Sequence, residues 1–350
     1  MLKNRILVVM LMLAMCSMLC VGCGSSSNTV DASVNADKLS VVCTIFPEYD
    51  WAREIAGELG NHYEMTLLMD NGADLHNYQP TAQDMAKIAA CDIFVYVGGE
   101  SDGWVQDALK EATNPNMQVI NLLEVLGTDV KEEELVEGMQ EEHEHEHDEA
   151  HEHEAGEEHE DEHNHDHEDG EVEYDEHVWL SLKNTKTIVN ALAQAFEKAD
   201  EANALIYQEN AKAYMEKLSA LDQEYEDAVL HASKKTILFG DRFPFRYMVD
   251  DYGLDYYAAF VGCSAETEAS FDTITFLAGK VDEWNINTVF VLENSNQKIA
   301  KTIIENTADK NQNILELNSL QSVTAEDIES GVTYLTIMQE NLEALKQALN

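Results

Sequence analysis

Positive charge is scarce in this chain of 350 residues. Lys and Arg together number 21 against 68 Asp and Glu, which gives a formal net charge of -47. A surface of this sign repels the phosphates of nucleic acids and of anionic membranes, and it raises the local concentration of cations. The composition therefore excludes nucleic acid as a partner.

The amino terminus lacks the charge cluster that stops a segment in the membrane. Lys3 and Arg5 precede an apolar run over residues 6–21, and only a polar stretch rich in Gly and Ser follows it. This pattern predicts an export signal over 1–22 and a flexible tether over 23–38. A single membrane-spanning helix is the alternative.

Disulfide-forming cysteine pairs are missing as well. The sequence CVGC at 20–23 is similar to a lipobox, although its first residue is Cys where Leu is usual. It predicts a lipid on the sulfur of Cys23, which would anchor the chain to the cell membrane. After loss of the signal, Cys43, Cys91 and Cys263 remain, an odd number that implies no disulfide framework. Cys43 and Cys91 are interpreted as small buried hydrophobic residues.

Strand-like and helix-like runs alternate along the rest of the chain. Alternation of this kind predicts parallel sheets that helices cover on both faces. We predict an α/β fold with an N-terminal lobe over residues 39–200 and a C-terminal lobe over 232–350. The strand-like runs are residues 39–46, 63–69, 92–97 and 118–122 in the first lobe, and 236–239, 256–261, 288–292 and 314–317 in the second.

A linker helix is predicted over 201–231, between the lobes. No Gly or Pro occurs from residue 201 to residue 230, and apolar residues recur at spacings of three and four, the pattern of one buried helical stripe. These residues are Tyr214, Leu218, Leu221, Tyr225 and Val229. A helix of this length spans about 45 Å and can tie two lobes together stiffly.

An acidic insert interrupts the first lobe over residues 131–174. Nine of the 13 His of the chain alternate with carboxylates there, and so polar a composition cannot bury a core. We predict that the insert is disordered without metal and forms a secondary site for metals such as zinc. The histidines are His143, His145, His147, His151, His153, His159, His163, His165 and His167.

The pattern H-E-x-x-H occurs twice within the insert, at 143–147 and 159–163. A zinc protease needs this motif on an amphipathic helix beside a cleft, so that the metal keeps an open position and the Glu can act as a base. The insert has no apolar face. We therefore exclude a protease.

Two other histidines stand in more informative surroundings. His76 lies in GADLHNYQPTAQD, between a strand-like run and the helix start at Thr81, which is where open α/β sheets place ligand groups. His177 lies in DEHVWLSLKN, at the far end of the insert. Taken alone, each pattern is more typical of a surface or structural His than of a metal ligand.

Together, the two blocks resemble those of the zinc- and manganese-binding proteins of ABC importers, which read G-x-x-P-H-x-Y-x-P-T-x-x-D and D-P-H-V-W-L-D-P. The runs DIFVYVGGESDGWVQDAL and YLTIMQENLEALKQAL are similar to that family too, so the resemblance covers nearly the whole mature chain. It implies two Rossmann-like lobes with parallel sheets, joined by a long rigid helix, and a metal site in the cleft between them. It also implies that His76 and His177 are the ligands of the first lobe.

The second lobe departs from the family pattern at both expected ligands. Gly240 stands where the family has His or Glu, and Asn318 stands where it has Asp. We predict Asp241 and Glu293 as the replacement ligands, although Asp241 could instead pair with the neighbouring Arg or cap the next helix.

Four further groups remain open as ligands of the second lobe. They are Glu266, Glu268, the side-chain carbonyl of Asn318, and Cys263. Cys263 would be a soft zinc ligand, and the resemblance places it near the cleft.

The resemblance predicts a binding protein and not an enzyme. We expect a monomeric extracytoplasmic lipoprotein that captures a divalent metal and delivers it to an ABC permease. Zinc is the expected metal because of the His-rich insert, and manganese or iron is the alternative, since carboxylate-rich sites favour manganese. Because ligating His must be neutral, we expect the affinity to fall as the pH drops through the imidazole range near about 6.5.

Two rival classes of function have weaker support. In a metal-buffering lipoprotein the insert would be the functional part and the lobes a scaffold. A metallohydrolase needs a general base beside an open metal position, and no such set of residues is identifiable in the sequence.

Overall fold

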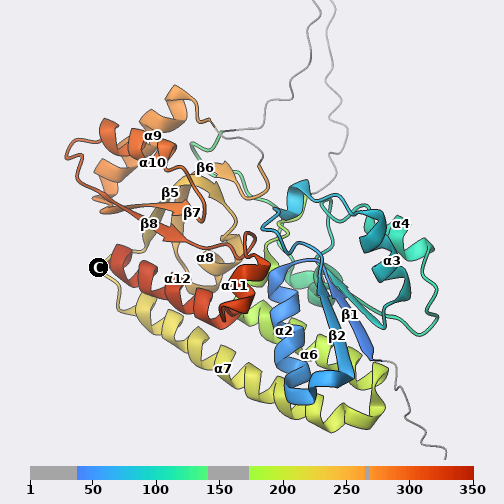
Figure 1. Cartoon of the computed structure of the whole chain (residues 1–350). Helices are drawn as coiled ribbons and strands as arrows, with labels where there is room; N and C mark the ends of the chain where they lie inside the picture. The colour runs from blue at the N-terminus through green and yellow to red at the C-terminus, as the bar shows by residue number, and fades with distance from the viewer. Residues whose placement is uncertain (1–37, 141–172, 265–267) are drawn as a thin grey trace, which may run out of the picture. The chain divides into compact units, whose positions relative to one another are not determined.

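Residues 38–140, 173–264 and 268–350 are described by the computed structural model, and they build two four-stranded sheets with helices packed on them (Figure 1). The predicted signal peptide, Cys23, the tether before residue 38 and all nine histidines of the insert lie outside the described residues. Within the described part of the chain, no helix is long and apolar enough to cross a bilayer.

The first sheet is parallel throughout. Its strands are β1 (Leu39–Cys43), β2 (Tyr63–Leu67), β3 (Ile93–Tyr96) and β4 (Gln118–Asn121), and its helices are α2 (Phe46–Ala56), α3 (Ala82–Ala90), α4 (Val105–Lys110), α5 (Leu122–Leu126) and α6 (Leu182–Ala199). Side chains alternate along β1, so Val41 and Cys43 pack with α2 and α6, whereas Val42 packs with α3 and α4. The strand order is β2-β1-β3-β4, and the loops after β2 and β3 meet beyond the carboxyl ends of these strands.

The second sheet repeats this design with the order β6-β5-β7-β8. Its strands are β5 (Thr236–Phe243), β6 (Asp255–Val261), β7 (Thr288–Leu292) and β8 (Asn313–Leu317), and its helices are α8 (Arg246–Tyr252), α9 (Phe271–Trp284), α10 (Lys298–Asn306), α11 (Ala325–Glu329) and α12 (Tyr334–Leu349). Helices α9 and α10 cover one face, and α12 packs on the other. Two parallel sheets with helices on both faces confirm the predicted α/β fold.

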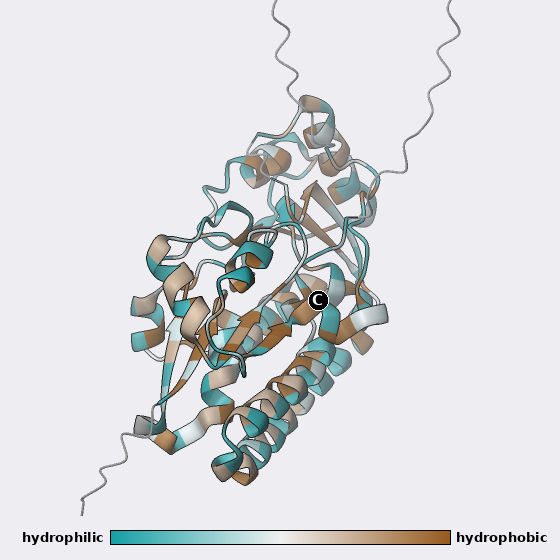
Figure 2. Ribbon diagram, turned by 90° about the vertical axis from the view of Figure 1, so that its right-hand side faces the viewer, coloured by the Kyte–Doolittle hydropathy of each residue, from teal (hydrophilic) through white to brown (hydrophobic). Residues whose placement is uncertain are grey.

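Helix α7 (Ala204–Leu230) packs against both halves of the molecule: α2 and α6 of the first, and α8 and α12 of the second (Figure 1). All five apolar positions of the predicted stripe are buried. A 3-10 turn at Glu201–Asn203 (η5) precedes the helix, so the α-helix begins three residues after the predicted start. Figure 2 shows that the long helices carry both apolar and polar residues, and the apolar stripe of α7 is among its buried positions.

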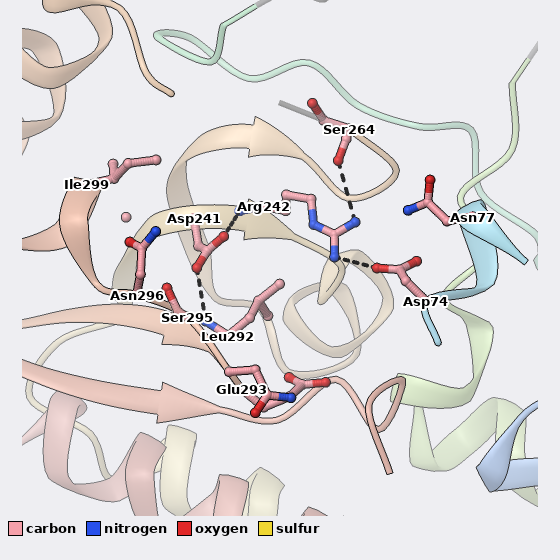
Figure 3. Close-up of a pocket in the computed structure, with 12 residues that line it drawn as sticks. Asp74, Asn77, Asp241, Arg242, Ser264, Leu292, Glu293, Ser295, Asn296 and Ile299 are labelled. Carbon is pink, nitrogen blue, oxygen red and sulfur yellow. Dashed lines mark hydrogen bonds and ion pairs between the residues drawn. The ribbon is translucent and has the colours of Figure 1, made fainter. Parts of the chain in front are cut away.

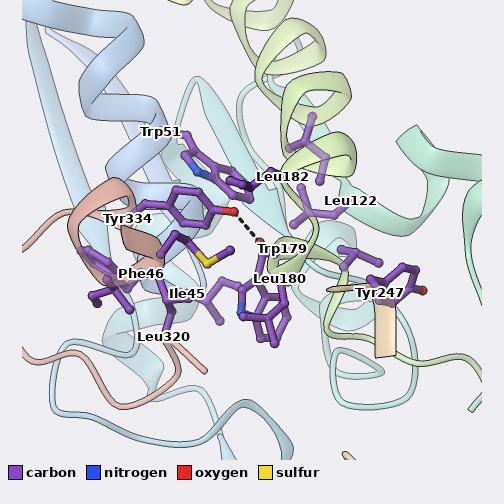
Figure 4. Close-up of a cluster of buried hydrophobic side chains, with 14 of the residues drawn as sticks. Ile45, Phe46, Trp51, Leu122, Trp179, Leu180, Leu182, Tyr247, Leu320 and Tyr334 are labelled. Carbon is purple, nitrogen blue, oxygen red and sulfur yellow. Dashed lines mark hydrogen bonds between the residues drawn. The ribbon is translucent and has the colours of Figure 1, made fainter. Parts of the chain in front are cut away.

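A continuous apolar core joins the two halves (Figure 4). The ring of Trp51 in α2 lies 5.3 Å from the ring of Tyr334 in α12, centroid to centroid. Tyr334 Oη donates a hydrogen bond to the carbonyl of Trp179 at 2.7 Å, and Trp179 Nε1 donates to the carbonyl of Ser319 at 2.8 Å. Because Trp179 follows His177 by two residues, groups of the second half hold the second histidine block in place.

Both ends of the acidic segment predicted at 131–174 belong to the fold. Glu132 pairs with Tyr174 in an antiparallel bridge, and the backbone N–H of Gln140 donates to a carbonyl of β6 at 3.0 Å. Met139 between them is buried. The acidic composition assigns these residues to the insert. Their bridge and their apolar contact involve partners that are distant in the sequence, and composition does not reveal such contacts.

Candidate metal centre

The first histidine block forms a short loop between β2 and α3. Its 3-10 turn, Leu75–Asn77 (η2), begins at Asp74, whose Oδ1 accepts a hydrogen bond from the backbone N–H of His76 at 3.1 Å. Asp favours such positions because its carboxylate satisfies a donor that the turn leaves open. Leu75 is buried and anchors the loop, and the side chain of His76 is only 11% exposed.

The second histidine block enters a 3-10 turn, Val178–Leu180 (η4), whose three residues are all buried. His177 itself is fully buried. Asp175 Oδ1 accepts hydrogen bonds from both the backbone N–H and the ring Nδ1 of His177, each at 2.9 Å. A carboxylate on Nδ1 fixes the proton there, so the lone pair of Nε2 is free to bind a metal.

The structure brings the two rings together. His76 Nε2 lies 3.2 Å from His177 Nε2, although the residues are 101 positions apart. Two nitrogens that bind one tetrahedral zinc at about 2.0–2.1 Å lie about 3.3 Å apart. The observed distance therefore fits two corners of a zinc site.

A serine and a buried carboxylate orient the ring of His76. Its Nδ1 forms a hydrogen bond of 2.8 Å with Ser101 Oγ, and the backbone N–H of Ser101 donates to Glu176 Oε1 at 2.9 Å. The second oxygen, Glu176 Oε2, lies 3.6 Å from His76 Nδ1. Gly99 leaves room for the carboxylate of Glu176, since a Cβ at position 99 would stand 2.2 Å from Glu176 Oε1. The backbone φ of +81° also favours Gly there.

The third group is the thiol of Cys263. Among the described residues, only one group of three or more potential ligands has its ligand atoms within 4.8 Å of one another: His76, His177 and Cys263. Cys263 lies in the turn after β6, where its backbone N–H donates to Glu133 Oε1 at 3.1 Å. Gly262 permits the close approach, because a Cβ there would lie 3.0 Å from His177 Cε1. Thiolate and imidazole together suit zinc.

The structure does not bring Asp241 and Glu293 into this group. Asp241 accepts hydrogen bonds from the backbone N–H of Arg242 at 3.0 Å and of Leu292 at 3.4 Å. Glu293 accepts from the N–H and the hydroxyl of Ser319, at 2.8 and 2.6 Å. Both residues line a separate cavity of about 390 Å³ (Figure 3). Their oxygens accept hydrogen bonds at strand ends, and neither residue belongs to the group that contains the two histidines.

The other predicted positions have different roles or lie elsewhere. A Cβ on Gly240 would come within 2.7 Å of Ala300 Cα, so the tight packing of β5 on α10 excludes a ligand side chain there. The side-chain carbonyl of Asn318 accepts from the N–H of Leu320 at 2.8 Å and holds a turn. Glu268 is exposed and pairs with a lysine. Glu266 lies outside the described residues.

Burial decides the protonation of the centre. Burial, followed by the neighbouring His177, lowers the pKa of His76 to about 3, so this ring is neutral at physiological pH. Burial, followed by the charge of Glu133, raises the pKa of the Cys263 thiol. The pKa of His76 thus lies below the range near 6.5 that the sequence suggests, and a metal that binds Cys263 would displace the proton of the thiol.

We expect zinc binding near pH 7 to release about one proton, from Cys263, and the affinity to rise about tenfold per pH unit between about pH 6 and 8. Titration calorimetry in two buffers of different ionisation enthalpy measures the proton release. A variant without residues 141–167 avoids protons from the insert. The same variant with Cys263→Ser should release none, and equal release from both proteins would contradict the role of the thiol.

The chain matches a known family over most of its length. The family described as ZnuA, zinc-uptake complex component A, periplasmic, matches residues 41–348. The chain is 31% identical over 337 residues to the high-affinity zinc uptake system protein ZnuA of Bacillus subtilis, with 96% of each chain covered. It is also 29% identical to the zinc-binding lipoprotein AdcA of Streptococcus pneumoniae, over 97% of this chain and 60% of that protein.

A solved structure agrees with these matches. The crystal structure of the Zn(II)-bound ZnuA-like domain of Streptococcus pneumoniae AdcA is similar, with a TM-score of 0.65 and 27% identity, over 89% of this chain and 99% of that domain. None of these descriptions is that of an enzyme, in agreement with the expected binding protein. By the extent of the family match and the identity to the Bacillus subtilis protein, this chain belongs to the ZnuA family of zinc-uptake complex components.

Proposed function

We propose that the chain captures a zinc ion with His76, His177 and Cys263 and delivers it to an ABC-type importer. The facing Nε2 atoms, 3.2 Å apart, carry the proposal because this spacing suits tetrahedral zinc. The names of the relatives, a zinc uptake system protein and a zinc-binding lipoprotein, support both the ion and the process.

Zinc is favoured over manganese by the chemistry of the third group. Manganese prefers carboxylate oxygens, whereas a thiolate favours zinc and other soft or borderline metals. The carboxylates of Asp241 and Glu293, which would suit manganese, are engaged with backbone groups of the second half. A fourth position is left for water or for a nearby carboxylate such as Glu133, which lines the same cavity of about 300 Å³ as His76 and Cys263.

The protein would work outside the cytoplasm as a monomer, anchored to the membrane through a lipid on Cys23. The lipobox-like sequence supports this anchor, as does the lipoprotein nature of the pneumococcal relative. The nine histidines between residues 143 and 167 would collect ions near the centre or respond to their level.

Zinc titration with and without the insert tests this function. We expect the full chain and a variant lacking residues 141–167 to share one tight site, with additional weaker binding in the full chain only. Uptake of zinc by cells that depend on either protein measures delivery. A tight site that disappears with the insert would favour the metal-buffering lipoprotein, and tight binding without uptake would contradict delivery to an importer.

A further inference from the structure

Arg242 stands at the end of β5, where the strand is irregular. The pairing of β5 with β6 shifts register between Phe239 and Arg242, so β5 has one residue more than β6 over this stretch. Asp241 holds the irregularity by accepting from the N–H groups of Arg242 and Leu292. A bulge of this kind re-aims a side chain. Figure 3 shows the result: the guanidinium of Arg242 reaches across the cavity toward Asp74.

The guanidinium joins the two loops that carry the proposed ligands. Arg242 Nη2 donates to Asp74 Oδ2 at 2.6 Å, and Nη1 donates a longer hydrogen bond of 3.4 Å to the carbonyl of Ser264. Asp74 caps the turn of His76 with its other oxygen, and Ser264 follows Cys263 directly. One side chain therefore contacts both neighbourhoods of the metal centre without contributing a ligand.

We propose that the Arg242–Asp74 ion pair is a latch that sets how fast the bound metal leaves, an inference that rests on the proposed function. The imidazoles come from the first half and the thiol from the second, so release requires the two loops to separate. The two side chains are 21% and 22% exposed, which shields the pair partly from solvent. Loss of such a pair acts mainly on the dissociation rate.

Stopped-flow release of zinc to excess chelator tests the latch in protein without residues 141–167. We expect Arg242→Gln and Asp74→Asn each to release zinc about threefold to tenfold faster. The double variant should be no faster than either single one. The Asn variant keeps the side-chain oxygen that caps His76. The unmodified protein should release zinc faster as salt is added, whereas the variants should not respond.

Arg53→Gln is the matched control, because Arg53 forms an ion pair with Asp50 in α2 and contacts neither loop. It should keep the normal rate. Arg242→Lys retains the charge and should keep part of the salt response, which provides a second variant if the Gln variant folds poorly. Variants that bind zinc and release it at the normal rate at every salt concentration would overturn the latch. Failure of the unmodified protein to bind zinc would instead overturn the proposed function.

Discussion

Replacing His177 by alanine is expected to raise the dissociation constant for zinc by about a thousandfold or more, since one of three protein ligands is lost from a site of this class. His177 is fully buried, and Asp175 fixes its ring so that Nε2 faces His76. The carboxylate of Asp175 cannot replace the ring, because it lies on the Nδ1 side. Competition with a chelator of known affinity measures the change.

A second histidine provides the control for this experiment. His231 is exposed at the end of α7, where its Nδ1 forms a hydrogen bond with the carbonyl of Asp227. His231→Ala should leave the affinity unchanged. Thermal unfolding in the presence of chelator separates lost ligation from lost folding, and His177→Gln preserves more of the buried volume. Unchanged affinity in a folded His177→Ala protein would remove the basis of the metal centre.

Replacing Cys263 by serine is expected to weaken zinc binding about a hundredfold and to reduce the preference for zinc over manganese. A thiolate gives a metal such as zinc a softer and stronger ligand than a hydroxyl does. Cys263→Asp places a carboxylate near the two imidazoles instead, and it should shift the preference further toward manganese. Competitive titration with zinc and manganese reports both effects.

Cys91 is the matched control for Cys263. Its thiol is buried against the first sheet and donates to the carbonyl of Ile88 at 3.2 Å, and it does not belong to the group of His76, His177 and Cys263. Cys91→Ser should lower the stability and leave the affinity and the metal preference as they are. If Cys263→Ser behaves in the same way as Cys91→Ser, the thiol at 263 serves packing and not ligation.

The sequence predicts the features that local patterns determine. Each strand carries a short apolar run, and α7 carries its own buried stripe, so both sheets and the long helix follow from neighbouring residues. The prediction that the two histidines are ligands rests on the resemblance of both blocks to those of a known family, since neither pattern alone indicates a ligand. Their convergence depends on contacts between distant segments, such as the hydrogen bond from the Ser101 N–H to Glu176, which ties the block of His177 to the loop after β3.

The proposed ligand of the second half, Cys263, stays one of several open candidates at the level of the sequence. Alignment with the family pattern assumes that the end of β5 faces the histidines. The packing of Gly240 on α10 and the bulge at Asp241 instead direct Arg242 toward Asp74. The space beside the imidazoles is filled by the loop after β6, which brings Cys263. Contacts between distant elements decide this arrangement, and no local pattern carries them.

The bridge between Glu132 and Tyr174 affects how freely the sequence between these two residues can vary. The bridge pairs a residue before the His-rich segment with one after it, so the folded chain leaves and re-enters at neighbouring points. Doubling the length of such a loop costs only about 0.6 kcal/mol in closure entropy. The number and order of the histidines can therefore change at little cost to the folded part of the chain, to which Asp175 and His177 belong.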